Sequence, residues 1–172
     1  MLMSSKVNDI VMDHMTTSDW SQVRSIYLEG IETGNATFDT EAPDWEEWDR
    51  KYLKDCRLVA REAGKVIGWA ALLPTSSKKA FAGAAELSIY LSKQSIGKGI
   101  GTKLMAYLIE ESEANGFWTL QSGIFPENKG SIRLHESAGF IEVGVRERIG
   151  KLNGVWRDVV LLERRSRIVG ID

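Results

Sequence analysis

Three glycines stand at alternate positions in the stretch QSIGKGIGTKL, residues 94–104. A strand-like segment precedes this stretch, and an apolar pattern of helical spacing follows it. The first N–H groups of a helix have no partner inside the helix, and the helix dipole adds positive potential there. A Cβ at these positions would keep an anion away from the backbone, so glycine suits Gly97, Gly99 and Gly101. The stretch therefore predicts a phosphate-binding turn, to which Lys98 and Lys103 could add charge.

Two common nucleotide-binding patterns do not fit this stretch. A Walker loop needs Ser or Thr after Gly-Lys, whereas Gly97-Lys98 is followed by Gly99. The dinucleotide fingerprint needs a third glycine where the chain has Thr102, and it opens a parallel strand–helix–strand unit that this sequence does not predict. A plain tight turn between strand and helix is the remaining alternative, although one glycine would be enough for it.

Glu86 is the strongest candidate for a general base. It lies in AAELSIYL, residues 84–91, where its neighbours Ala84, Ala85, Leu87 and Ile89 are apolar. An apolar setting raises the pKa of a carboxylate toward neutral pH, as a base requires. A carboxylate exposed at a sheet edge would show the same local pattern, so the residues alone leave both alternatives open.

The other reactive side chains are few. Cys56 is the only cysteine, is expected in a strand, and is interpreted as a buried structural residue that forms no internal disulfide. The two histidines, His14 and His135, are far apart, and carboxylates and cysteines do not cluster with them. We therefore expect no metal site.

Length and composition favour one soluble domain over residues 1–172, with a core of about residues 8–164 and a tail at 165–172. The net charge of −2, with both signs interspersed, provides no basic surface for nucleic acid or for an anionic membrane. The start lacks the apolar segment of a signal peptide, and no run of about 20 apolar residues could span a bilayer. A cytoplasmic location is the expectation.

Hydrophobic periodicity predicts the elements that position these residues. Strands are expected at residues 9–15, 57–62, 65–74, 84–91, 117–125, 140–150 and 155–164. Helices are expected after a cap at Thr17 or Ser18, from Pro43 through residue 53, from Lys98 to Gly116, and at 128–139. This order predicts an α/β (α+β) fold in which a mixed, mostly antiparallel sheet is flanked by about four helices.

The pattern Gln/Arg-x-x-Gly-x-Gly/Ala is met by Gln94, Gly97 and Gly99 and resembles the pyrophosphate signature of the GCN5-related N-acetyltransferases (GNAT). Several segments are similar to the phosphinothricin and methionine sulfoximine N-acetyltransferase branch: IYLEGIETGNATFDTEAPDWEEW, VIGWAALLP, AELSIYL, IFPENKGSIRLHESAGF and GVWRDVVLLERR. The resemblance implies a GNAT fold and transfer of the acetyl group of acetyl-CoA to the primary amine of a small amino acid or analogue. Phosphinothricin, methionine sulfoximine and arsinothricin are the substrate types implied, with direct transfer in a ternary complex.

The resemblance also implies roles for individual residues. Glu86 occupies the place of the family's catalytic glutamate, and one backbone N–H beyond it is expected to stabilise the oxyanion. The residues expected to bind acetyl-CoA are Ile89, Tyr90, Leu91, Gln94, Gly97, Lys98, Gly99, Ile100, Gly101, Thr102, Asn128 and Ser131. Asn128 is also expected to cap the helix that follows it.

His135, in LHESAGF, stands where many members of the superfamily have a tyrosine that protonates the departing thiolate. Histidine can transfer protons near neutral pH, so a catalytic role and a structural role both remain open. On the acceptor side, Phe38 and Trp69 are expected as apolar walls, with a core role as the alternative. Lys78 and Phe81 lie between the third and fourth strands, where the branch usually has an arginine and an aromatic residue; no arginine occurs here.

Two other functions fit parts of the pattern. A non-catalytic sensor of acyl-CoA would need the glycine turn but could dispense with Glu86 and the acceptor loop, both of which are present. A protein N-terminal acetyltransferase would need an open groove for a peptide. The expected partners are acetyl-CoA, a small amine and, by family resemblance, a second copy of the chain in a homodimer, without nucleic acid or membrane.

Overall fold

The computed structural model describes residues 9–172, and the expected start of the core at residue 8 lies outside the described residues. Seven strands form one sheet in the order β1-β2-β3-β4-β5-β7-β6. They are β1 (Ile10–His14), β2 (Leu58–Glu62), β3 (Lys65–Pro74), β4 (Ala84–Leu91), β5 (Thr119–Ile124), β6 (Ile141–Leu152) and β7 (Val155–Arg165). All neighbouring pairs are antiparallel except β4 and β5. The predicted mixed, mostly antiparallel sheet is confirmed.

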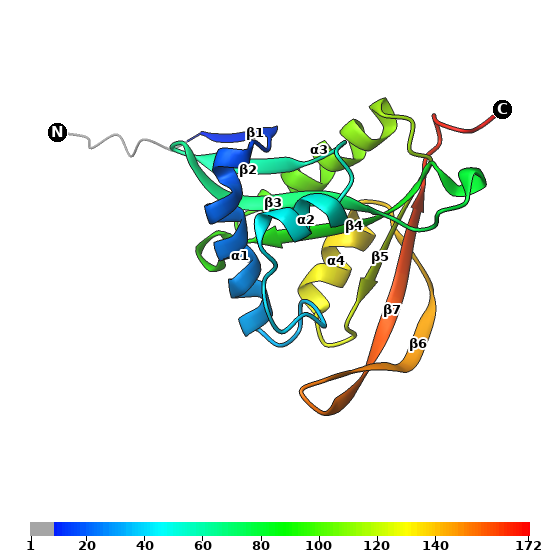
Figure 1. Ribbon diagram of the computed structural model, residues 1–172. Coiled ribbons are helices and arrows are strands. Elements are labelled where there is room, and N and C mark those ends of the chain that lie inside the picture. Colours follow the sequence, from blue (N-terminus) through cyan, green and yellow to red (C-terminus); the bar gives the residue numbers. More distant parts are fainter. Residues whose placement is uncertain (1–8) are drawn as a thin grey trace.

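Four helices cover the two faces of this sheet (Figure 1). α1 (Trp20–Glu32) and α2 (Trp45–Lys51) pack on one face, where Val23, Tyr27, Trp48 and Trp69 form a buried aromatic core. α3 (Ile100–Ala114) and α4 (Lys129–Ser137) pack on the other face. There the core contains Leu58, Leu72, Leu87, Leu104, Met105, Leu108, Leu120 and Leu162. The tip of the β6–β7 hairpin extends away from the helices.

The two N-terminal helix caps differ from those expected. Thr16, rather than Thr17 or Ser18, caps a short 3₁₀ turn over Thr17–Asp19, and the Asp19 carboxylate accepts a hydrogen bond from the Thr16 N–H at 2.8 Å. The same carboxylate is held by Arg61, so its place is decided by a residue on β2. α2 was expected to begin at Pro43 but begins at Trp45, after the cap Asp44, whose side chain accepts from the backbone N–H of Glu47 at 2.9 Å.

The C-terminal strand is longer than the sequence predicts. Arg164 was expected to end this strand and Arg165 to begin the tail, but Arg165 pairs with Thr119 of β5 and so also belongs to β7. Their long alkyl stems allow charged arginines to lie along a sheet while the guanidinium groups reach polar partners. Among the helices described for residues 9–172, none combines the length and apolar character that crossing a bilayer requires.

Candidate active site

The parallel pairing between β4 and β5 stops after three residue pairs. Ala84, Ala85 and Glu86 pair with Thr119, Leu120 and Gln121, and no later residue of either strand pairs with the other. Beyond Glu86 the sheet therefore opens, and the edge of β4 that faces β5 has no strand partner. A cavity of about 550 Å³ lies at this opening.

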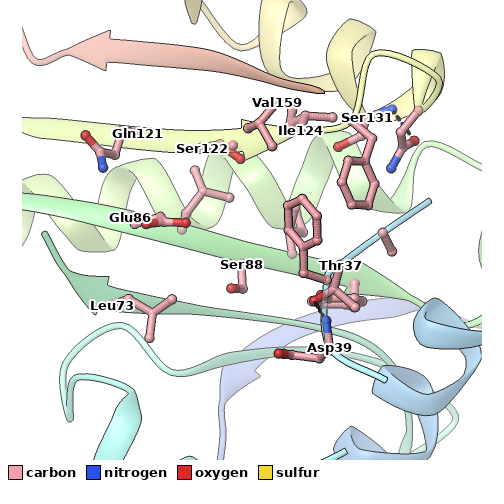
Figure 2. A pocket seen from close by; sticks show the side chains of 18 of the residues that line it. Thr37, Asp39, Leu73, Glu86, Ser88, Gln121, Ser122, Ile124, Ser131 and Val159 are labelled. Atoms are coloured by element: carbon pink, nitrogen blue, oxygen red, sulfur yellow. Dashed lines mark hydrogen bonds between the residues drawn. The ribbon is translucent and has the colours of Figure 1, made fainter. Parts of the chain in front are cut away.

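Side chains from both halves of the molecule line this cavity. Glu86 and Ser88 project from the same face of β4, as strand alternation requires, and Gln121 and Val159 lie on the β5–β7 side (Figure 2). The loop between α1 and α2 contributes Asn35, Ala36, Thr37, Phe38 and Asp39 on the opposite side. Lys51, Tyr52 and Arg146 complete the polar lining around Glu86.

Glu86 is half-buried and lies between Leu73 of β3 and Gln121 of β5. Burial raises the pKa of its carboxyl group above the ordinary value, while the charges of Lys51 and Arg146 act in the opposite direction. The apolar neighbours expected from the sequence are not the cause, because Ala85 and Leu87 point into the core on the α3 face. Glu86 is thus a carboxylate at a cavity, with a pKa shifted toward the range of a general base.

His135 also lines the cavity but is almost completely buried. Its Nδ1 lies 2.7 Å from the carbonyl oxygen of Ser131, and a carbonyl can only accept, so Nδ1 carries the proton. Burial lowers the pKa of the ring, which favours the neutral form with a lone pair on Nε2. Within residues 9–172, Nε2 has no hydrogen-bond partner. The ring therefore carries a buried acceptor that no residue of the described chain uses.

The glycine stretch forms the turn between β4 and α3. Gly97 and Gly99 have φ values of 79° and 78°, which side-chain-bearing residues rarely adopt. Within residues 9–172, the N–H groups of residues 97–102 donate no hydrogen bond to a main-chain carbonyl. Lys98 is exposed beside them, whereas the Ile100 side chain is buried. Unpaired N–H donors at the start of a helix are suited to bind an anionic group.

Gly101 is needed for a different reason from the one expected. It is buried, and a Cβ there would lie 3.2 Å from the Leu91 side chain and 3.4 Å from that of Leu134. Its small size therefore serves packing of α3 and not the approach of a ligand. Gln94 lies in the 3₁₀ turn Lys93–Ser95 and, with Lys98, borders a second hollow on the α1 side. The glycine turn itself does not line the 550 Å³ cavity.

Of the other residues expected to bind the cofactor, some line the cavity and some do not. Ile89, Tyr90, Asn128 and Ser131 line the cavity, whereas Leu91 and Thr102 do not. Asn128 caps α4 as predicted, because its side-chain oxygen accepts from the Ser131 N–H at 3.3 Å. From Glu86 to Leu91 the strand advances about 17 Å at ~3.3 Å per residue, so only an elongated ligand could reach both ends.

Only one of the four residues expected to bind the acceptor lies in the cavity. Phe38 lines it and packs edge-on against Phe125, with ring centroids 4.8 Å apart. Trp69 is completely buried behind Tyr90, on which it stacks at 4.9 Å, so it supports the cavity without facing it. Lys78 and Phe81 lie exposed in the loop between β3 and β4, outside the cavity, because that loop projects from the sheet.

The polar residues that the sequence did not indicate come from distant elements. Lys51 ends α2, Arg146 lies on β6, and Asp39 accepts a hydrogen bond from the Tyr27 hydroxyl. Alternation along β4 could have indicated Ser88, because it shares a face with Glu86. Nothing in the local sequence marks the other residues. Throughout residues 9–172, no three His, Cys, Asp or Glu side chains gather as metal ligands would.

Cys56 does not lie in a strand. It has a φ of 60° in the turn before β2, and its side chain is buried. Burial raises the pKa of its thiol to about 12, so the reactive thiolate is disfavoured. This supports the structural interpretation of Cys56.

Arg157 of β7 ties the α1–α2 loop to the rest of the cavity. Its Nη1 donates to the Gly34 carbonyl at 2.8 Å, and its Nη2 donates to Asn35 Oδ1 at 2.7 Å. The same Nη2 lies 3.2 Å from the Glu127 carboxylate, and the guanidinium lies 4.0 Å from the centroid of the Phe125 ring. One largely buried cation therefore holds the α1–α2 loop and the segment after β5 against β7.

Comparison with known proteins gives a consistent picture. The model of the acetyltransferase (GNAT) family matches residues 20–140. The phosphinothricin N-acetyltransferase of Streptomyces viridochromogenes is 31% identical over 166 residues, which are 94% of this chain and 91% of that protein. The L-methionine sulfoximine/L-methionine sulfone acetyltransferase of Salmonella typhimurium is 35% identical over 106 residues, or 62% of each chain.

Solved structures share the fold. A phosphinothricin acetyltransferase from Sinorhizobium meliloti in complex with acetyl-CoA matches with a TM-score of 0.84 and 28% identity, covering 95% of this chain and 91% of that one. A ribosomal-protein-alanine N-acetyltransferase from Brucella melitensis matches with a TM-score of 0.82 and 31% identity, covering 91% and 99%.

The contacts of Arg157 predict what its loss would do. Arg157→Gln removes the charge that holds residues 34 and 35, so backbone amides of residues 34–39 should exchange about tenfold faster. Hydrogen exchange read by mass spectrometry measures this directly. Arg164→Gln is the control, because Arg164 lies on the same strand and pairs with Glu113 at 3.0 Å, away from the loop. Equal acceleration in both variants would contradict the clamp.

Proposed function

The chain belongs to the acetyltransferase (GNAT) family and is an acetyl-CoA-dependent enzyme, and from this premise we propose that it acetylates the primary amine of a small amino acid or amino-acid analogue. The family predicted from the motifs is thereby confirmed. The observation that carries the proposal is the position of Glu86, at the end of the β4–β5 pairing and in the wall of the cavity.

Relatives support the class of acceptor. Proteins named for phosphinothricin and for methionine sulfoximine share 31% and 35% identity with this chain over the matched residues. A cavity of about 550 Å³ falls within the range usual for small-molecule sites. We infer that the acceptor is an amino acid or analogue of this size.

The glycine turn and the free edge of β4 fit the two ends of acetyl-CoA. The unpaired N–H groups of residues 97–102 provide donors for the diphosphate, with Lys98 beside them. The edge of β4 beyond Glu86 lacks a strand partner, so its backbone can bind the amide groups of the pantetheine arm. This arrangement directs the thioester toward Glu86.

Direct transfer in a ternary complex needs two proton movements. Glu86 takes a proton from the acceptor ammonium group, and the free amine then attacks the thioester carbonyl carbon. A main-chain N–H on the free edge of β4 stabilises the negative charge on the carbonyl oxygen. The carbon–sulfur bond then breaks, and the second proton of the nitrogen passes to the departing thiolate sulfur, so that the amide and the thiol of CoA are released.

In this scheme His135 is better suited to position the cosubstrate than to protonate the departing thiolate. Its Nδ1–H is committed to the Ser131 carbonyl, and the lowered pKa keeps Nε2 unprotonated near neutral pH. A neutral Nε2 can accept a hydrogen bond from an amide or thiol of the cosubstrate, but it has no proton to give. We therefore assign His135 to positioning rather than to acid catalysis.

A second function has one specific observation in its favour. The structure from Brucella melitensis, whose name describes acetylation of a ribosomal protein, is 31% identical to this chain. Acetylation of a peptide N-terminus is therefore the alternative acceptor chemistry. A non-catalytic sensor is disfavoured, because Glu86 faces a cavity large enough for an acceptor.

A homodimer is the proposed assembly, in a cytoplasmic setting where acetyl-CoA is formed and used. β6 is an edge strand, so its outer backbone groups have no partner in the described sheet. Ile141, Val143 and Val145 on this strand are each more than half exposed. An edge strand with exposed β-branched residues is suited to bury them against a second copy.

Release of CoA thiol from acetyl-CoA tests the enzymatic proposal. We expect turnover with phosphinothricin or methionine sulfoximine, and Glu86→Gln should lower kcat by about 10²- to 10⁴-fold without changing acetyl-CoA affinity. In the wild type, kcat/KM should fall as pH drops through the raised pKa of Glu86, because the protonated carboxyl cannot act as a base.

Glu163→Gln is the matched control, since Glu163 lies two strands from Glu86 and outside the cavity. Unchanged turnover in Glu86→Gln would remove Glu86 from the mechanism. Turnover with peptides but with none of the amino acids would favour the alternative function.

Gly99→Val tests the glycine turn. A valine at a φ of 78° is strained, and its side chain would stand among the proposed diphosphate donors, so calorimetry should show acetyl-CoA binding weakened by about tenfold or more. Gly64→Val is the control, because Gly64 has the same φ of 78° in the remote β2–β3 hairpin. An unaffected binding constant in Gly99→Val would refute the assignment of the turn.

Val145→Lys tests the assembly. A charge on β6 should shift the protein from dimer to monomer in analytical ultracentrifugation, because burying it at an interface is unfavourable. Ile168→Lys changes an even more exposed apolar residue outside the strand and should leave the sedimenting mass of the protein unchanged. A wild type that sediments as a monomer at micromolar concentration would rule out the dimer.

A further inference from the structure

We propose that Lys51 and Arg146 form a two-point anion site on either side of Glu86, which binds the two acid groups of an acceptor amino acid. The inference rests on the proposed function and assigns the contacts of its acceptors: one cation for the α-carboxylate and one for a second acidic group, where the acceptor has one. Neither residue lies in the segment between β3 and β4 that the family resemblance indicated for acceptor binding.

The fold places the two cations on opposite sides of the cavity. Lys51 is the last residue of α2, on the side of the cavity formed by the helices and their loop. Arg146 is opposite Val159 in the β6–β7 pairing, and residues opposite each other in an antiparallel pair share a face of the sheet. Val159 faces the cavity (Figure 2). Arg146 therefore faces it as well and is one of the residues that line it. Glu86 lies between them on β4.

Both cations are close enough to act on Glu86. Their positive charges each favour its ionised form, and the effect of Lys51 is the larger of the two. In an α-amino acid, the carboxylate is separated from the amine by one carbon. With the amine held at Glu86, we assign the α-carboxylate to Lys51 and the second acid to Arg146 on the other side of the cavity.

Lys51 retains donors for a ligand. Its closest carboxylate is that of Asp39, with Nζ and Oδ2 3.8 Å apart, which is longer than a hydrogen bond. Asp39 already accepts from the Tyr27 hydroxyl. The Lys51 side chain is 49% exposed, so an incoming carboxylate can reach its ammonium group.

Arg146 also has no carboxylate partner among residues 9–172. Two arginines of the neighbouring strand, Arg157 and Arg164, are instead paired with Glu127 and Glu113. A guanidinium group presents parallel N–H donors that match the two oxygens of a carboxylate or phosphinate. An unpaired arginine facing the cavity is therefore suited to the larger of the two acid groups.

Three acceptor substrates that differ in their acid groups can distinguish the contact of Lys51 from that of Arg146. Phosphinothricin has both acids, methionine sulfoximine has only the α-carboxylate, and methionine sulfoximine carboxamide has neither. Arg146→Gln should raise KM for phosphinothricin by about 10- to 100-fold and leave the other two within about twofold. Lys51→Gln should raise KM by a similar factor for phosphinothricin and methionine sulfoximine, which both have the α-carboxylate, and should leave KM for the carboxamide unchanged. Because each cation also favours the ionised form of Glu86, KM is compared at a pH well above the raised pKa of that group, where its carboxylate is ionised in every variant.

Two matched variants control for loss of surface charge. Lys54→Gln removes a lysine three residues from Lys51 that pairs with Asp49 outside the cavity. Arg148→Gln removes an arginine of β6 that lies over Trp156, also outside it. Both should keep the wild-type KM for every acceptor.

The outcomes distinguish this inference from the proposed function. Wild-type transfer with no change in KM in either cavity variant would refute the anion site alone. An equal change for all three acceptors would also refute it, because it would indicate that the cations only tune Glu86. Absence of thiol release from the wild type with every acceptor would overturn the proposed function and this inference together.

Discussion

The early end of the β4–β5 pairing is the constraint on which the site depends. A parallel pair within a mainly antiparallel sheet must be joined by a crossover, here α3, and the two strands share only three residue pairs before they part. The opening that results leaves backbone groups unpaired on β4, places Glu86 at its narrow end and directs β4 into the glycine turn. A sheet fully paired at this point would have neither a cavity nor a free edge for a ligand.

Side chains that close the cavity come from elements far apart in the chain. The α1–α2 loop lies across it and is held by Arg157 of β7, while Phe38 packs on Phe125 and against Gly150. Because these contacts join the N-terminal and C-terminal halves, the acceptor side forms only when the whole domain is folded. The glycine turn, by contrast, is built from consecutive residues.

The positive charges of Lys51 and Arg146 affect the pKa of Glu86 and are also proposed to bind the acceptor. Burial makes its carboxyl group a stronger base, while Lys51 and Arg146 limit that shift and keep the group ionised more easily. Lys51 has its nearest ion-pair partner, Asp39, at 3.8 Å and thus beyond hydrogen-bond distance, and Arg146 has no ion-pair partner among residues 9–172, so both can bind an anionic acceptor. His135, whose ring is held neutral by burial, adds an acceptor without adding charge.

Local sequence was sufficient for most of the fold and for the turn. Apolar periodicity located the strands and helices, alternate glycines marked Gly97 and Gly99, and Glu86 could be chosen because it is a lone carboxylate in an apolar strand. Tertiary structure alone decided which faces meet: it buried Trp69 behind Tyr90, left Lys78 and Phe81 outside the cavity, and brought Lys51 and Arg146 toward Glu86. Hydrophobic patterns record which side of an element is buried, but the pairing of strands distant in sequence determines which polar side chains share a cavity.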